Sequence, residues 1–258
     1  MSRSVFVGLI AILFCSFQTG CCCCSDFMKG FNKGFQQGLQ KAQKQAEEEE
    51  RRAQKAKEDE AKQVIAQNLG PNDRAGLLAA NSPFWNQLRP KIAKKGFQAT
   101  ELIGPGARND PTFTDTGPEP GVLIGVFACD QQDGGVVSYL QPIFLTAQGE
   151  KTGQAYGKLS TRPVHVLKAK SGYAVGGIKL RHGGAIDQVQ LVFMRVDGEK
   201  LNPADQQLSA KVGVEGAVPL QVLSTGPLVV GLGGTRGQEG GFSPPGTPSS
   251  LSLLTLQQ

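Results

Sequence analysis

Cysteine is almost absent beyond the first 24 residues of this chain. Five of the six cysteines lie between Cys15 and Cys24, and the sixth is Cys129. The part of the chain that follows residue 24 therefore has no internal disulfide, so its hydrophobic core must stabilise it without a covalent cross-link. Cys129 is most simply interpreted as a small buried apolar residue.

Residues that usually carry catalysis are also scarce. The chain has two histidines, His165 in an apolar run and His182 in a glycine turn. Zinc-binding and phosphate-binding motifs and the serine-nucleophile elbow are missing from the sequence. We therefore expect a protein that is not an enzyme and has no catalytic residue, metal site or cofactor. A catalytic role would require one of the histidines to line a cleft together with carboxylates.

Positive charge is not concentrated in any segment. The formal net charge of +5 is spread along the chain, and no basic cluster is interleaved with aromatic residues. This distribution argues against a nucleic-acid partner.

The first 24 residues are typical of an export signal. Arg3 precedes a thirteen-residue apolar run, Val5–Phe17. A helix of that length spans about 20 Å, which is less than the bilayer core of about 30 Å, so a signal peptide is favoured over a permanent span. Thr19-Gly20-Cys21 resembles the lipobox of bacterial lipoproteins, which implies lipid attachment at Cys21 and a location in the cell envelope. An uncleaved signal segment and a plain cleaved signal are the alternatives.

Residues 25–69 are expected to form a helical stalk. Proline is absent from Asp26 to Asn68, and strong helix formers dominate. Apolar residues recur every four positions in the first half, beside a row of glycines, and they are Phe27, Phe31, Phe35 and Leu39. This stripe favours contact with membrane lipid, self-association of the helix into a homo-oligomer, or a simple spacer. The second half, Lys41–Gln63, is polar on all sides and is expected to be a solvated spacer.

Residues 70–121 are expected to connect the stalk to a further domain. Gly70-Pro71 should end the helix, and residues 104–121 are rich in proline and glycine, as is typical of a linker. One or two short helices are expected within residues 74–103, with Trp85 as a packing residue. Their apolar contacts would come from Leu77, Leu78, Phe84, Trp85, Leu88 and Ile92.

From Val122 to the last residue, Gln258, the pattern predicts an all-β domain. Short apolar runs with a period of two alternate with glycine-rich turns. The expected strands are Val122–Ala128, Val136–Thr146, Val164–Lys170, Tyr173–Arg181, Ile186–Val196, Leu208–Val214, Ala217–Leu223, Leu228–Leu232 and Leu251–Leu256.

A threefold repeat is present within this domain. Each copy has a strand, a Gly-Gly turn and a second strand. Gly125, Gly177 and Gly231 are equivalent, with spacings of 52 and 54 residues. The repeat predicts three sheets around a pseudo-threefold axis, with Ser138 and approximately Ser249 at the positions that match Asp187.

The second copy, Tyr173–Leu191, resembles the β-prism motif of jacalin-related lectins, and Leu228–Gly237 resembles the closing repeat of that family. Vitelline membrane outer layer proteins are similar in the same way. The resemblance implies a β-prism-like domain of three Greek-key-type repeats that binds carbohydrate, with ligand contacts from Asp187, Gly183 and Gly184. The closing repeat lacks the family's sugar-binding Asp, and an Asp after a glycine turn often caps that turn, so a capping role for Asp187 is the alternative.

Together these patterns predict an exported, membrane-anchored lipoprotein. It would present a non-catalytic jacalin-like β-domain that binds a ligand such as a glycan or another envelope component. The alternative is a structural protein of the cell envelope that self-associates through its N-terminal helix.

Overall fold

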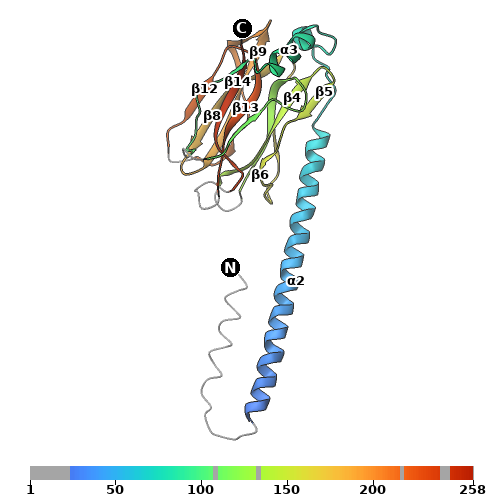
Figure 1. Ribbon diagram of the computed structural model, residues 1–258, viewed down its shortest axis with the longest axis vertical. Helices are drawn as coiled ribbons and strands as arrows, with labels where there is room; N and C mark the ends of the chain where they lie inside the picture. The colour runs from blue at the N-terminus through green and yellow to red at the C-terminus, as the bar shows by residue number, and fades with distance from the viewer. Residues whose placement is uncertain (1–23, 107–109, 132–134, 216–217, 239–244, 258) are drawn as a thin grey trace. The chain divides into compact units, whose positions relative to one another are not determined.

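The structure of the chain is a computed structural model (Figure 1). It describes residues 24–106, 110–131, 135–215, 218–238 and 245–257, with side chains from Phe35 onward. The chain divides into two compact units, Met1–Ala53 and Gln54–Gln258. Cys21 lies outside the described residues, as do the side chains of Phe27 and Phe31.

The expected long N-terminal helix is confirmed as α2, Cys24–Gln67. In the first unit its side chains from Phe35 to Ala53 are mostly exposed to solvent, and Phe35 itself is 50% exposed. Glu48 and Arg52 form an ion pair between successive turns, at 2.8 Å. Among the helices in the described part of the chain, none is long and apolar enough to cross a membrane.

The last part of α2, from Gln54 onward, belongs to the second unit and packs on the β-domain. Ala61 is buried, and Ile65 packs against the hydrophobic core. The expectation that the helix is a solvated spacer as far as Gln63 is therefore wrong at this end. The reason is a short apolar stripe at helical spacing, formed by Ala61, Val64 and Ile65, which the surrounding charges obscure in the sequence.

The connector contains the two expected short helices, η1 (Gly76–Leu78) and α3 (Phe84–Ala93). Phe84 and Leu88 are buried. Trp85 is buried as well, and its Nε1–H donates a hydrogen bond of 2.7 Å to the carbonyl oxygen of Ala79. The prediction that Trp85 is a packing residue is confirmed.

Three antiparallel sheets form the β-domain. The first sheet has the order β5 (Gly149–Thr152), β4 (Val137–Thr146), β3 (Val122–Asp130) and β7 (His165–Lys168), with β6 (Tyr156–Gly157) also paired to β4. The second has the order β10 (Lys200–Leu208), β9 (Ile186–Asp197), β8 (Tyr173–His182) and β12 (Gln221–Ser224), with β11 (Val212–Gly213) also paired to β9. The third has the order β1 (Phe97–Ala99), β14 (Pro248–Leu256), β13 (Val229–Arg236) and β2 (Thr112–Asp115).

Each sheet is built around one hairpin of the predicted repeat. The hairpins are β3–β4, β8–β9 and β13–β14, and each lies between edge strands. The first strands of the three hairpins, β3, β8 and β13, pack against one another. The predicted mainly β, β-prism-like fold of three repeats is therefore present.

The edge strands differ most from the expected ones. β1 and β2 lie within residues 70–121, the expected connector, and complete the third sheet. β10 is largely polar and has a register shift between Asn202 and Gln206, so it has no apolar alternation to reveal it. The strand expected over Leu208–Val214 is present only in part, because Leu208 is the last residue of β10, residues 209–211 are not in a strand, and Val212–Gly213 form the short β11.

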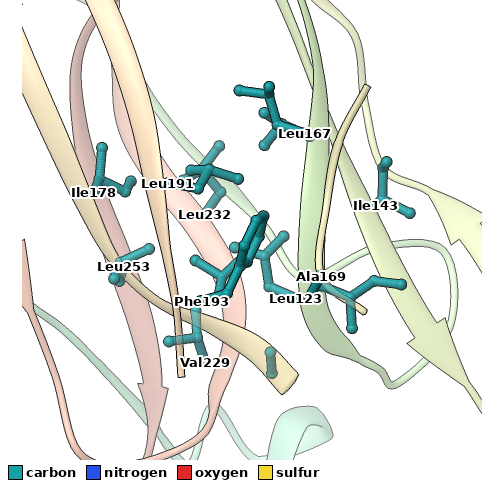
Figure 2. Close-up of a cluster of buried hydrophobic side chains, with 14 of the residues drawn as sticks. Leu123, Ile143, Leu167, Ala169, Ile178, Leu191, Phe193, Val229, Leu232 and Leu253 are labelled. Carbon is teal, nitrogen blue, oxygen red and sulfur yellow. The ribbon is translucent and has the colours of Figure 1, made fainter. Parts of the chain in front are cut away.

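The core lies between the three sheets and draws on all of them (Figure 2). The labelled side chains include Leu123 from the first sheet, Phe193 from the second and Leu253 from the third. β3 and β14 are buried at every position instead of at alternate ones. The small residues of these strands, among them Gly125 and Ser252, leave space for neighbouring segments to cover both faces.

Candidate functional site

The three hairpins turn at the same end of the β-domain, which we call the hairpin end. It is the end at which β3, β8 and β13 finish. The backbone N–H of Val214 donates to the carbonyl oxygen of Gly135 at 3.2 Å and to that of Asp187 at 2.9 Å, so the first two turns are joined. Thr247 of the third turn lies against Gly157, which pairs with β4 beside the first turn.

Asp130, His182 and Arg236 occupy equivalent places at this end. They are the last residues of β3, β8 and β13, and each lies five residues beyond the repeat glycine. In each strand a register shift lies directly before this residue. We call the three positions the first, second and third strand-end sites.

Each strand-end residue has a polar atom that is buried without a hydrogen-bond partner. The atoms are Oδ1 of Asp130, Nε2 of His182 and Nε of Arg236, and no other buried side-chain nitrogen or oxygen in the described part of the chain is unpaired. A buried polar atom without a partner costs about 1 to 3 kcal/mol. Natural folds keep such atoms rarely, and a ligand that pairs with them is one reason to do so.

The first strand-end site is built on a buried carboxylate. The Asp130 side chain is 9% exposed, and its Oδ2 lies 3.2 Å from Nη1 of Arg162. The hydroxyl of Ser160 donates to the backbone carbonyl of Asp130 at 2.6 Å and lies 3.0 Å from the sulfur of Cys129. Cys129 is buried, as the sequence predicted. Oδ1 of Asp130 is left as a strong acceptor beside a cation.

The second strand-end site contains the residues that the lectin resemblance singled out. Nδ1 of His182 lies 3.3 Å from the carbonyl oxygen of Gly183. A Cβ atom on Gly183 would lie 3.4 Å from Oδ2 of Asp187, so the carboxylate rests over the turn, and Gly184 lies within that turn. Burial raises the pKa of Asp187, and the charge of His182 opposes that shift.

The third strand-end site has a carboxylate that the repeat did not predict. Ser249 is the second residue of β14, as Asp187 is of β9, and its hydroxyl donates to Oδ2 of Asp110 at 2.7 Å. The hydroxyl of Thr235 lies 2.8 Å from that of Ser249. Asp110 therefore lies beside the position where the second repeat has its own Asp. No sequence signal indicated this, because Asp110 comes from a segment outside the repeat.

Tyr156 links the third site to the first sheet. Its ring stacks on Phe113 with centroids 4.0 Å apart, and its hydroxyl donates to Oδ2 of Asp115 at 3.3 Å. Burial raises the pKa of Tyr156, the negative charge of Asp115 adds to the increase, and the positive charge of Arg236 opposes it. The charge of Arg236 therefore acts on a buried tyrosine that stacks on the partly buried Phe113.

His165, the other histidine, is exposed on β7 opposite Ala128. Within the described residues, no group of three or more His, Cys, Asp or Glu side chains could hold a metal ion.

No protein-family model and no curated protein matches the chain. The structure is similar to solved structures of lectins. One is a Malaysian banana lectin, with a TM-score of 0.43 and 12% identity over 63% of this chain and 100% of that chain. Another is a mannose-binding jacalin-related lectin from Ananas comosus, with a TM-score of 0.43 and 11% identity over 62% of this chain and 98% of that chain.

A third is artocarpin, a lectin with mannose specificity, with a TM-score of 0.44 and 9% identity over 61% of this chain and 96% of that chain. The strand order of the three sheets and the threefold repeat define the β-prism-like fold.

Proposed function

We propose that the β-domain is a non-catalytic binding module that holds a glycan, or another polyhydroxylated envelope component, at its hairpin end. One observation carries this proposal. Three repeat-equivalent residues, Asp130, His182 and Arg236, each leave a buried polar atom unpaired at the same end of the domain.

The chemistry of these atoms fits a polyhydroxylated ligand. The carboxylate oxygen of Asp130 accepts hydrogen bonds, Nε of Arg236 donates one, and the imidazole of His182 can do either. A sugar hydroxyl both donates and accepts, so neighbouring hydroxyls can pair with acceptors and donors in turn. A ligand that binds here recovers the free energy that the unpaired atoms cost the folded protein.

Binding is tested with the full-length protein on a broad glycan array that includes mannose-terminated, galactose-terminated and N-acetylglucosamine-terminated probes. We expect binding to at least one probe class, reduced about tenfold or more by Asp187→Asn or Arg236→Met, since a lost charged hydrogen bond is worth about 1.5 to 3 kcal/mol. Asp205→Asn is the matched control, because it removes a surface carboxylate from β10 in the second sheet. An array without any bound probe would contradict the proposal.

We further propose that the protein is exported and held at a membrane by lipid on Cys21. Support comes from the apolar run Val5–Phe17 and the junction Thr19-Gly20-Cys21. Intact-mass measurement of the mature protein tests this, with a mass that begins at residue 21 and carries acyl chains as the expected result. An unmodified N-terminus at any residue would refute it.

The rival function is assembly of the cell envelope through α2. It is favoured by one observation, the 50% exposure of Phe35 on a helix face that the sequence predicts to be apolar. Sedimentation of the protein without residues 1–24 tests it. A stable oligomer that Phe35→Gln dissociates would support assembly, and a monomer would exclude self-association through this helix.

A further inference from the structure

Residues 159–164, which we call the bridging loop, lie between the docked part of α2 and the first strand-end site. Two side chains of the helix contact the loop. Nε2 of Gln54 donates to the carbonyl oxygen of Leu159 at 3.3 Å, and Nζ of Lys57 donates to that of Thr161 at 3.1 Å. A groove of about 160 Å³ separates the helix from the rest of the loop, lined by Lys57, Glu60, Ala61, Val64 and residues 161–164.

The opposite side of the bridging loop is fixed to Asp130. The hydroxyl of Ser160 donates to the backbone carbonyl of Asp130, and the guanidinium of Arg162 pairs with its carboxylate. The hydroxyl of Ser160 also accepts the backbone N–H of Arg162 at 3.0 Å, and the sulfur of Cys129 lies 3.4 Å from the carbonyl oxygen of Arg162. One short loop is thus bonded to the helix by its carbonyl groups and to the candidate site by its side chains.

The helix side of this connection is weak. Between Gln54 and Val64 one residue, Ala61, is buried, and the donor Lys57 is exposed. The helix end is held more firmly, because Nζ of Lys168 donates to the carbonyl oxygen of Asn68 at 2.7 Å and to the buried carboxylate of Glu150 at 2.9 Å. Segments with few buried contacts open locally at low free energy, so residues 54–64 can detach while Asn68 stays fixed.

We propose that the bridging loop couples ligand binding at Asp130 to docking of helix residues 54–64 on the β-domain. The proposal rests on the function proposed above for the hairpin end. A ligand hydroxyl that donates to Oδ1 of Asp130 fixes the carboxylate, and the 46% exposed Arg162 is placed to contact the same ligand. When Ser160 and Arg162 are ordered, the backbone between them is ordered as well. This fixes the loop carbonyl groups that accept hydrogen bonds from Gln54 and Lys57. Binding then favours the docked helix, and the docked helix favours binding to the same extent.

Hydrogen exchange of the full-length, ligand-free protein tests the connection without any ligand. Arg162→Gln removes the ion pair to Asp130 from a half-exposed side chain, so the fold is retained. We expect amide exchange in residues 54–64 to become about fivefold faster, as the loss of one net hydrogen bond predicts. Asp205→Asn, which breaks the Arg195–Asp205 pair in the second sheet, is the control and leaves these amides unchanged. Faster exchange confined to residues 159–164 would overturn the proposal.

The reciprocal test uses the helix side. Gln54→Ala combined with Lys57→Met should weaken binding of whichever array probe the wild type binds by about fivefold. That same probe, at saturation, should slow exchange in residues 54–64 of the wild type. Unchanged affinity and unchanged exchange would refute the coupling while the binding function stands. An array with no bound probe would refute the binding function, and the exchange result for Arg162→Gln would still decide whether the loop connects site and helix.

Discussion

Gly177 lies so close to the carbonyl oxygen of Leu223 that a Cβ atom on the glycine would be 2.6 Å from it. The same relationship holds between Gly231 and the carbonyl oxygen of Asp115, at 2.6 Å, and between Gly125 and that of Leu167. In each sheet the glycine marks a register shift in the first hairpin strand, and the carbonyl belongs to the neighbouring edge strand. The repeat glycine is therefore required by close approach of two backbones.

Gly177→Ala should lower the free energy of unfolding by about 1 to 3 kcal/mol, because the added methyl group must push β12 away from β8. Urea unfolding followed by circular dichroism measures the change. Gly226→Ala is the matched control, since a Cβ atom there would meet nothing within 4 Å. Equal stability of the two variants would show that the edge strand moves without cost.

The buried charges of Arg74 and Glu150 should be needed for stability. Glu150 is 6% exposed and lies 2.9 Å from Nζ of Lys168 and 3.7 Å from Nη2 of Arg74, which is 5% exposed. Glu150→Gln leaves the Arg74 charge buried without its carboxylate, and such a change costs about 3 to 5 kcal/mol. Asp205→Asn, which breaks a partly exposed pair, should cost less than about 1 kcal/mol. Thermal and urea unfolding of both variants check the difference.

Asp187 should destabilise the fold at neutral pH. Its pKa is raised above the usual 3.8 in the folded protein, mainly by burial. The folded state therefore holds this proton to higher pH than the unfolded state. The ionised carboxylate destabilises the folded state above the raised pKa, and this destabilisation is relieved as the pH falls toward 3.8. Asp187→Asn should be more stable than wild type at neutral pH by less than about 1 kcal/mol, since the group is partly solvated. The difference should shrink in acid, as measured by urea unfolding across the pH range, and a variant less stable at neutral pH would contradict this.

Tyr139 should make the protein sensitive to alkali. Burial, with a smaller contribution from Cys129, raises the pKa of Tyr139 from 10.0 to about 12. The unfolded chain loses this proton first, so stability declines as pH rises from about 10 toward 12, by about 2 to 3 kcal/mol in total. Tyr139→Phe should remove this contribution to the alkaline loss of stability. The variant also lacks the 2.7 Å hydrogen bond from the Tyr139 hydroxyl to Gln141. Unfolding curves at neutral pH and in alkali test this, and an unchanged alkaline decline in the variant would exclude Tyr139 as its source.

The hairpins could be predicted because their strands carry apolar residues and their turns carry glycine. β8 and β9, for example, begin at the expected residues Tyr173 and Ile186. β10 could not be predicted, because an edge strand needs little apolar surface and its polar residues resemble a loop. β2 lies in a segment rich in proline and glycine, where pairing with β13 decides its conformation.

The sequence singled out some residues of the candidate site, and their role in ligand binding stays a prediction. Gly183 and Asp187 do come together, since both belong to one local turn. Asp130, His182 and Arg236 share a position in the repeat, but their side chains differ, so no residue pattern marks them in the sequence. The spacing of the repeat glycines was the available signal, because it makes the three positions equivalent. The structure then shows that each of the three side chains leaves a buried polar atom unpaired.

The third sheet is made of strands from widely separated parts of the chain, and this sets the order in which the domain can fold. Its strands β1 and β2 are synthesised before the first two sheets, whereas β13 and β14 are synthesised after them. On the ribosome, β2 must wait as an unpaired strand until its partner β13 has been made, and β1 must wait until β14 has been made. Contacts between such distant segments are slow to form, and unpaired edges are open to aggregation in the meantime. Removal of β14 would therefore take away the partner of β1 and β13 at once, and would leave the core open on one of its three sides.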